Sequence, residues 1–238
     1  MALFALGDTH LSIGTDKPMD IFGDRWKNHT EKLKKGWNSV VGENDTVVVC
    51  GDISWASCLE EACEDLKFLD SLNGKKLISR GNHDYWWSTL SKMKSFFNEL
   101  GINTIEILQN NAYIREGRVV CGSRGWFNDP KAAPRDIDYA KIIQREVQRL
   151  MLSLDCGVKL ALENGMDKSE ISVFLHFPPV FGDYVCGEIV ELMHKYNIRT
   201  CYYGHVHNVY NIPRCFEYEG IRMTIVSADY LGFVPLLL

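Results

Sequence analysis

Short apolar runs rich in β-branched residues alternate with amphipathic stretches along most of the chain. Runs such as Thr46–Cys50 have the length and composition of buried strands, and apolar residues repeated every three or four positions predict helices between them. The predicted strands are Ala2–Leu6, Thr46–Cys50, Lys76–Ser79, Thr104–Leu108, Ala112–Arg115, Arg118–Cys121, Ser172–Leu175, Arg199–Tyr203, Val209–Ile212 and Met223–Ala228. The predicted helices are Arg25–Val41, Cys58–Leu72, Trp86–Leu100, Asp136–Glu163 and Glu188–Tyr196.

The longest predicted helix has one apolar stripe, which is typical of a helix packed on a core. The stripe is Ile143, Val147, Leu150, Leu154 and Val158. Gly157 is a candidate kink within this helix. Arg115–Arg118 and Phe216–Arg222 predict hairpins, and the apolar tail Leu231–Leu238 predicts a buried final strand. Strands that alternate with helices and then give way to hairpins favour an α/β fold with mixed sheets.

Length and composition are those of a globular protein. With 238 residues, 46% apolar and 24% charged, residues 1–238 are expected to form a single domain, and disordered and coiled-coil classes are excluded. The net charge of −5 argues against strong binding to nucleic acid. None of the eight cysteines forms a C-x-x-C pair, which predicts free thiols in a reducing compartment. Without a leader or an apolar run of about 20 residues, we expect a cytoplasmic protein with no membrane span. The oligomeric state stays open.

Five predicted strands end directly in a polar cluster. Ligands bind outside the carboxyl ends of strands in α/β sheets, so these clusters are expected to meet in one crevice. Five of the seven histidines of the chain lie in them. The clusters are Gly7-Asp8-Thr9-His10, Gly51-Asp52, Gly81-Asn82-His83-Asp84, His176 and Gly204-His205-Val206-His207.

Carboxylate, amide and imidazole side chains without a thiolate are typical ligands of manganese, iron or zinc. A calcium site would use oxygen atoms alone, and structural zinc would favour cysteine. Three carboxylates, one amide and five imidazoles exceed the needs of one ion. Two metal ions that share a carboxylate fit this set and suit in-line attack on phosphorus.

The order D-x-H, G-D, G-N-H-D, H and G-H-x-H resembles the calcineurin-like metallophosphoesterase superfamily over Asp8–His207. The resemblance implies a four-layer α/β/β/α sandwich with mixed sheets and two metal ions (Mn, Fe or Zn). It implies that Asp8, His10, Asp52 and His207 hold one ion, and that Asp52, Asn82, His176 and His205 hold the other, with Asp52 as the bridge. His83 would face the substrate and protonate the leaving oxygen, a role that imidazole suits near neutral pH.

Differences from known subfamily motifs argue against two subfamilies. Gly51-Asp52 is followed by Ile53-Ser54-Trp55 and not by Asp-Arg-Gly, which disfavours a Ser/Thr protein phosphatase. No tyrosine adjoins Asp52, which disfavours a purple acid phosphatase. Arg80, directly before Gly81, is similar to the arginine that clamps phosphate in protein phosphatases.

Further candidates come from residue type and position. Arg124 is a second candidate phosphate contact, and Asp84 is a candidate to orient His83. Trp55 is a candidate wall for a flat substrate group, while the alternative for the cluster of Trp55, Trp86, Trp87 and Trp126 is packing in the core. The loops Leu11–Trp26 and Asp129–Asp138 are candidate rims of the crevice.

The sequence therefore predicts a metal-dependent phosphohydrolase that cleaves a monoester or diester in a small phosphorylated substrate. A nucleotide phosphodiesterase or nuclease is the alternative enzyme, although the acidic net charge weakens the nuclease version. A metal-binding scaffold without catalysis is the alternative from another class. The presence of His83 argues against the scaffold, because a scaffold has no need of a proton donor.

Overall fold

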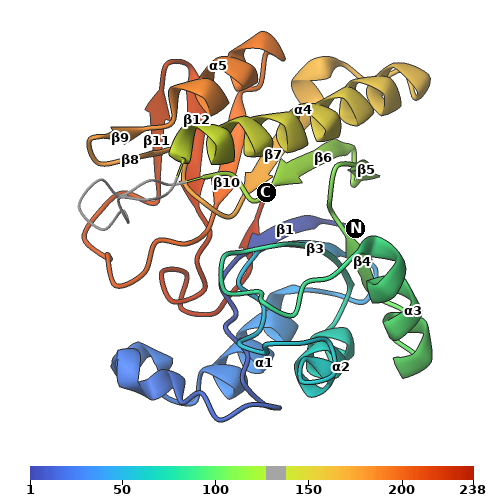
Figure 1. The fold of residues 1–238 in the computed structure, drawn as a ribbon, viewed down its shortest axis with the longest axis vertical. Helices are drawn as coiled ribbons and strands as arrows, with labels where there is room; N and C mark the ends of the chain where they lie inside the picture. Colours follow the sequence, from blue (N-terminus) through green and yellow to red (C-terminus); the bar gives the residue numbers. More distant parts are fainter. Residues whose placement is uncertain (127–137) are drawn as a thin grey trace.

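Two β-sheets lie face to face between two layers of helices in the computed structural model (Figure 1). The structure describes residues 1–126 and 138–238. The first sheet has the order β13-β1-β2-β3-β4 and consists of Leu236–Leu237, Leu3–Leu6, Thr46–Cys50, Lys75–Ser79 and Ile105–Ile107. The second has the order β11-β12-β10-β7-β6-β5 and consists of Cys215–Tyr218, Ile221–Ile225, Thr200–Tyr203, Ile171–Leu175, Arg118–Ser123 and Ala112–Arg115.

The helices cover the outer face of each sheet (Figure 1). Helices α1 (His29–Val40), α2 (Cys63–Ser71) and α3 (Leu90–Leu100) pack on the first sheet, and α4 (Tyr139–Glu163) and α5 (Gly187–Lys195) pack on the second. Both sheets are mixed, because the edge strands β13, β11 and β5 run antiparallel to their neighbours. The predicted four-layer α/β/β/α sandwich is confirmed.

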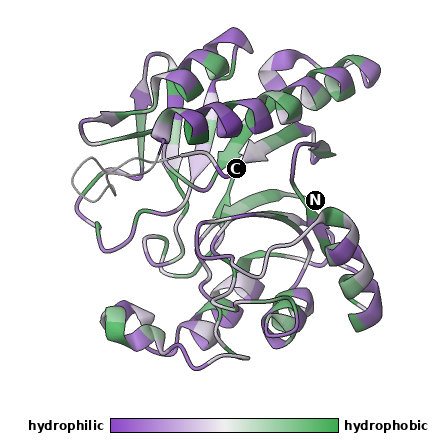
Figure 2. Cartoon of the chain, in the orientation of Figure 1, coloured by the Kyte–Doolittle hydropathy of each residue, from purple (hydrophilic) through white to green (hydrophobic). Residues whose placement is uncertain are grey.

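Alternation along the central strands produces three separate apolar layers. Val47 and Val49 of β2 face the helices, whereas Val48 and Cys50 face the second sheet, since successive side chains in a strand point to opposite faces. The strands are buried on both faces, and Figure 2 shows apolar strands between helices whose outer sides are polar. This packing holds the carboxyl ends of both sets of parallel strands at a common edge.

Helix α4 continues past Gly157 without a break, so the suggested kink is wrong. A Cβ atom added at Gly157 would lie 2.3 Å from the Sγ atom of Cys121 in β6. The glycine therefore permits close packing of the helix on the sheet. The predicted apolar stripe of this helix lies in the same core, with Leu150 and Leu154 fully buried.

Several predicted boundaries shift for local reasons. Helix α3 begins four residues later than predicted, because the Thr89 side chain caps it by accepting a hydrogen bond from the Lys92 amide. Helix α1 begins four residues later than predicted, because Asn28, with a positive φ of 52°, separates it from a short 3-10 turn at Asp24–Trp26. The strand predicted at Val209–Ile212 is wrong: the segment is irregular. Both sheet positions beside β10 are already taken by β7 and β12.

Both predicted hairpins are present as β5–β6 and β11–β12. The apolar tail does form a final strand, β13, but the prediction that it is buried is wrong, because this strand lies at a sheet edge and Leu237 is 61% exposed. A short hairpin that the sequence did not predict joins β8 (Val180–Phe181) to β9 (Tyr184–Val185). All eight cysteines are free thiols. Within the described ranges, no helix combines the length and the apolar character that a membrane crossing requires. The predicted rim segment at 129–137 lies outside the described residues.

Candidate metal centre

The five polar clusters do meet, at the carboxyl ends of β1, β2, β3, β7 and β10. Hydrogen bonds join the clusters across the two sheets. The His176 ring contacts the Cys50 carbonyl oxygen through Nδ1 at 3.0 Å. The His205 amide donates to Asp8 Oδ2 at 2.9 Å. The crevice is therefore built jointly by the ends of both sheets.

Strained backbone aims the side chains into this crevice. Asp8, His10, Asp52 and His205 have φ values of 59°, 43°, 49° and 68°, in the left-handed region. Such conformations cost free energy in residues other than glycine and cluster at functional sites. Gly81 is required for a different reason: a Cβ atom there would lie 2.1 Å from Asp52 Oδ1.

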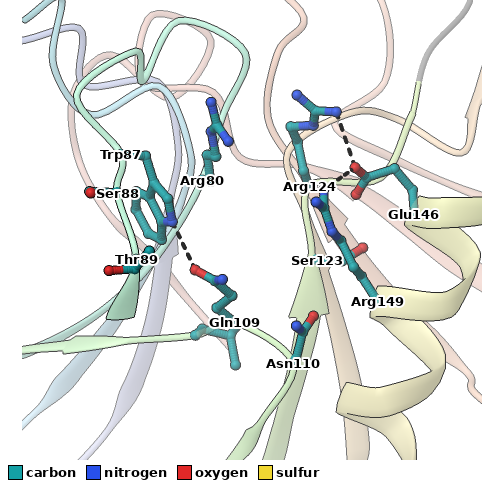
Figure 3. A pocket seen from close by; sticks show the side chains of 11 residues that line it. Arg80, Trp87, Ser88, Thr89, Gln109, Asn110, Ser123, Arg124, Glu146 and Arg149 are labelled. Atoms are coloured by element: carbon teal, nitrogen blue, oxygen red, sulfur yellow. Dashed lines mark hydrogen bonds and ion pairs between the residues drawn. The ribbon is translucent and has the colours of Figure 1, made fainter. Parts of the chain in front are cut away.

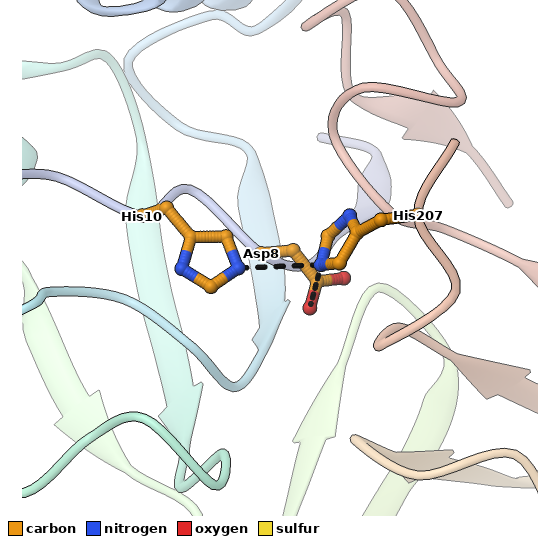
Figure 4. A group of neighbouring side chains, drawn as sticks. All are labelled: Asp8, His10 and His207. Atoms are coloured by element: carbon orange, nitrogen blue, oxygen red, sulfur yellow. Dashed lines mark hydrogen bonds and ion pairs between the residues drawn. The ribbon is translucent and has the colours of Figure 1, made fainter. Parts of the chain in front are cut away.

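Asp8, His10 and His207 form the first of two groups with metal-binding geometry among the described residues (Figure 4). Their ligand atoms lie within 4.8 Å of one another. The Nε2 atoms of His10 and His207 are 3.2 Å apart, and His207 Nε2 is 3.5 Å from Asp8 Oδ1. Three electron-pair donors thus point at a common centre.

Asp52, His176 and His205 form the second group, whose ligand atoms also lie within 4.8 Å of one another. Asn82 adds an amide oxygen, since its Oδ1 lies 2.7 Å from His176 Nε2. Because His176 Nδ1 faces the Cys50 carbonyl, it carries the ring proton, and Nε2 keeps its lone pair. The second group is therefore also a set of electron-pair donors.

Asp52, a member of the second group, also lies close to His10 of the first group. Its Oδ1 accepts a hydrogen bond from the His83 amide at 2.7 Å. Its Oδ2 is buried, accepts no hydrogen bond from the described residues, and lies 3.7 Å from His10 Nε2 and 3.4 Å from His176 Nε2. Burial, followed by the negative charges of Asp84 and Asp8, raises the pKa of Asp52 well above its usual value. A bound cation would compensate this charge, so the donor set fits a metal site.

Burial keeps most of the site imidazoles neutral. Desolvation lowers the pKa of His10 well below its usual value, and it lowers the pKa of His176 and of His205 to about 3. His207 behaves differently: burial disfavours its charged form, but the Asp8 charge and the Asp229 hydrogen bond outweigh burial and raise its pKa to about 10. Neutral imidazole is the form that binds a metal, so an ion at the first group would have to displace the second ring proton of His207.

Asp229 is a functional candidate that the sequence reasoning missed. Its Oδ1 accepts a hydrogen bond from His207 Nδ1 at 2.9 Å, and its Oδ2 accepts from the Asn208 amide and the Tyr210 hydroxyl. A carboxylate behind a ligand histidine fixes the tautomer and the ring orientation. A signal existed, because Asp229 directly follows the predicted strand Met223–Ala228.

Asp84 does not contact the His83 ring as expected. Its Oδ1 accepts hydrogen bonds from the Ile53 and Ser54 amides and from Trp86 Nε1, and its Oδ2 accepts from the Gly81 amide. Adjacent side chains point in different directions, and this carboxylate turns into the protein. Asp84 therefore joins the loop after β2 to the loop after β3, and any effect on His83 passes through the backbone.

His83 and Trp55 lie together beside the first group. Their ring centroids are 4.3 Å apart, and Trp55 stacks on His10 at 5.1 Å. Both line a cavity of about 310 Å³ to which the predicted rim loop contributes Met19, Phe22 and Trp26. The other three tryptophans of the predicted cluster lie in different environments. Trp86 is buried in the core, Trp126 packs against Phe177, and Trp87 lines a separate cavity with Arg80 and Arg124.

Comparison with protein-family models finds a match over most of the chain. The model of the family described as calcineurin-like phosphoesterase matches residues 1–209. Gene 66 protein of Mycobacterium phage L5 is 38% identical over 76 residues, which is 31% of this chain. That match spans 36% of the length of the phage protein.

Solved structures share the fold at low sequence identity. Phosphopantetheinyl hydrolase from Mycobacterium tuberculosis superposes with a TM-score of 0.54 at 15% identity, with 100% of this chain and 95% of that chain covered. A protein of unknown function from Aquifex aeolicus superposes with a TM-score of 0.51 at 16% identity, with coverage of 99% and 95%. At these identities the similarity extends to the fold alone.

Proposed function

This chain belongs to the calcineurin-like phosphoesterase family, whose members are metal-dependent phosphoester hydrolases, and from this premise we propose that it cleaves its substrate with two metal ions. One observation carries the dinuclear proposal: Asp52 Oδ2 is buried without a hydrogen-bond donor and lies between a histidine of each group. A shared carboxylate is the usual link between paired ions in phosphoesterases.

The proposed ligands follow from the two groups and their neighbours. Oxygen and imidazole nitrogen donors without a cysteine suit manganese, iron or zinc. We assign Asp8, His10, Asp52 and His207 to one ion, and Asp52, Asn82, His176 and His205 to the other. The participation of both sheets in these sets supports a single catalytic domain over residues 1–238.

When bound, the two ions would polarise the phosphoryl oxygens and lower the pKa of water so that it can act as a nucleophile at neutral pH. The residues of the chain position the carboxylate ligands and donate a proton. The His205 amide holds the carboxylate of Asp8, and the His83 amide holds that of Asp52. The His83 ring faces the cavity beside the first group, where it can protonate the leaving oxygen.

The cavity at His83 suits a small organic phosphoester rather than a phosphoprotein or long nucleic acid. Its volume is about 310 Å³, and Trp26, Trp55, Phe22 and Met19 make its wall apolar. Aromatic side chains of this kind also stack on nucleobases, which keeps a nucleotide phosphodiesterase as the second candidate. A metal-binding scaffold remains the non-catalytic alternative, and hydrolysis of any substrate would exclude it.

The proposal is tested by metal analysis together with a substrate panel. The panel contains p-nitrophenyl phosphate, bis-p-nitrophenyl phosphate, cyclic nucleotides and single-stranded DNA, each assayed with Mn²⁺, Zn²⁺ and Fe²⁺. Loss of a residue that hydrogen-bonds to a metal ligand lowers metal affinity or activity about 10- to 100-fold. Asp52 is itself a proposed ligand of both ions, so Asp52→Asn should lower kcat/KM by more than about 100-fold while the circular dichroism spectrum stays unchanged. Asp183→Asn, at an exposed carboxylate, is the matched control. A fully active Asp52→Asn variant with two bound metals would exclude the bridge.

The proposed role of His83 as the proton donor can be tested separately from the metal ligands. His83→Asn should lower kcat by about 10²- to 10⁴-fold, the usual contribution of a general acid. The metal content, measured by inductively coupled plasma mass spectrometry, should stay near two ions per chain. A variant that lost its metal would show that His83 is a ligand and not the proton donor.

A further inference from the structure

A second cavity, of about 410 Å³, lies beside the candidate metal centre and is lined by three arginines (Figure 3). Arg80 directly follows β3 of the first sheet, Arg124 directly follows β6 of the second, and Arg149 lies on α4. Among the described residues, its lining includes neither His83 nor any proposed metal ligand. The cavity is therefore distinct from the space at His83.

Short stretches of backbone connect this cavity to the metal centre. Arg80 is two residues before Asn82 in the chain. The Arg124 carbonyl accepts a hydrogen bond from the His176 amide at 3.2 Å. The backbone at Arg80 and at Arg124 therefore lies next to the proposed metal ligands Asn82 and His176.

The arginines are only partly neutralised. Glu146 is fully buried, and its Oε1 accepts from Arg124 at 3.0 Å and from Arg149 at 2.6 Å. This carboxylate holds two guanidinium groups on one wall, while Arg80 stands on the opposite wall (Figure 3). Arg80 has no carboxylate partner among the described residues, and its Nε atom is buried without a hydrogen bond. The described lining residues carry a net charge of +2.

The remaining wall suits a polar ligand. Trp87 donates from Nε1 to Gln109 Oε1 at 2.8 Å, which fixes both side chains at the edge of the cavity. Asn110 and Ser123 add further polar groups. Guanidinium groups bind phosphate with paired, charge-assisted hydrogen bonds, and a half-enclosed pocket strengthens the attraction.

We propose that this pocket binds a second phosphate group of the substrate, so that the substrate is a diphosphate or bisphosphate. One phosphoryl group is cleaved at the metal centre, and the other is held by Arg80, Arg124 and Arg149. The inference rests on the proposed function for the cleaved group, whereas the binding of a second phosphate is independent of turnover. The proposal assigns the arginines to this second phosphate group and not to the reacting phosphoryl group.

The test compares two probes that differ by one phosphate-like group. Binding of methylphosphonate and of methylenediphosphonate to the manganese-loaded full chain is measured by calorimetry. Neither probe contains a phosphoester or P–O–P bond, so neither can be hydrolysed during the measurement. The diphosphonate should bind at least tenfold more tightly, a difference of about 1.4 kcal/mol. Arg149→Met should reduce this preference below threefold, and Arg149→Lys should restore part of it.

Arg145→Met is the matched control, because Arg145 is an exposed arginine on the same helix and does not line the cavity. It should keep the full preference. Equal affinity of the two probes for the wild-type protein would overturn the proposal, and so would a preference that survives in Arg149→Met. If Arg149→Met lost the preference but the wild-type protein hydrolysed neither the panel nor adenosine 5′-diphosphate and adenosine 3′,5′-bisphosphate added to it, the pocket would stand and the proposed function would fail.

Discussion

Replacement of Asp229 by asparagine tests how far the metal centre depends on a residue that binds no metal. The carboxylate is fully buried and accepts three hydrogen bonds, one of them from His207 Nδ1 at 2.9 Å. Asparagine keeps the shape but has only one acceptor atom. It must therefore turn its NH₂ group toward His207 or toward the Asn208 amide and Tyr210 hydroxyl.

The expected magnitude follows from the bond that is lost. A hydrogen bond to a charged group contributes about 1.5–3 kcal/mol, and loss of a carboxylate behind a ligand histidine lowers metal affinity or activity about 10- to 100-fold. These two ranges agree, since each factor of ten equals about 1.4 kcal/mol. We therefore expect Asp229→Asn to weaken metal binding 10- to 100-fold, with loss concentrated at the ion that His207 holds.

The assay is titration of the metal-depleted protein with Mn²⁺, read by calorimetry and by recovery of hydrolysis. Tyr210→Phe removes one of the bonds to the same carboxylate and should weaken binding by less than Asp229→Asn does. Circular dichroism establishes that both variants are folded. Wild-type Mn²⁺ affinity in a folded Asp229→Asn variant would refute the positioning role of this carboxylate.

Two further predictions concern stability. Burial lowers the pKa of Lys76 to about 8. Between about pH 8 and 10.4 the unfolded chain therefore keeps a proton on this side chain that the folded chain has released. Over this interval the free energy of unfolding should rise with pH, by at most about 3 kcal/mol. Urea titrations at several pH values should show this rise in the wild-type protein and not in Lys76→Met; an equal slope in both would exclude Lys76 as its source. Gly157→Ala places a Cβ atom 2.3 Å from Cys121 Sγ and should cost about 1–3 kcal/mol of unfolding free energy. An unchanged melting temperature in that variant would show that α4 shifts to make room.

The strands and the five polar clusters could be predicted because each is local in the sequence. A parallel strand buried on both faces is a continuous apolar run, as in Val47–Cys50, and the residue that follows such a run lies at a known edge of the sheet. Helix starts were less predictable, since Thr89 and Asn28 set them through a cap and a positive φ rather than through the apolar pattern.

Contacts between segments that are far apart in the chain could not be predicted from the sequence. Asp84 was expected to orient His83, yet it bonds to the Ile53 and Ser54 amides, because the loop after β2 lies beside it only in the folded chain. Val209, Tyr210 and Ile212 are residue types that favour strands, but both neighbours of β10 in the sheet, β7 and β12, are already in place.

The sequence by itself determined which chemical groups this protein has at its strand ends, and hence its family and its use of metal. Only the tertiary structure decided which of those groups lie within ligand distance of one another, which carboxylate positions His207, and which charges face the neighbouring pocket. Asp229 supports His207, and Glu146 pairs with Arg124 across 22 residues, because separate elements are brought together by packing. Residue type and local pattern are encoded along the chain, whereas distance in space depends on how every element is placed at once.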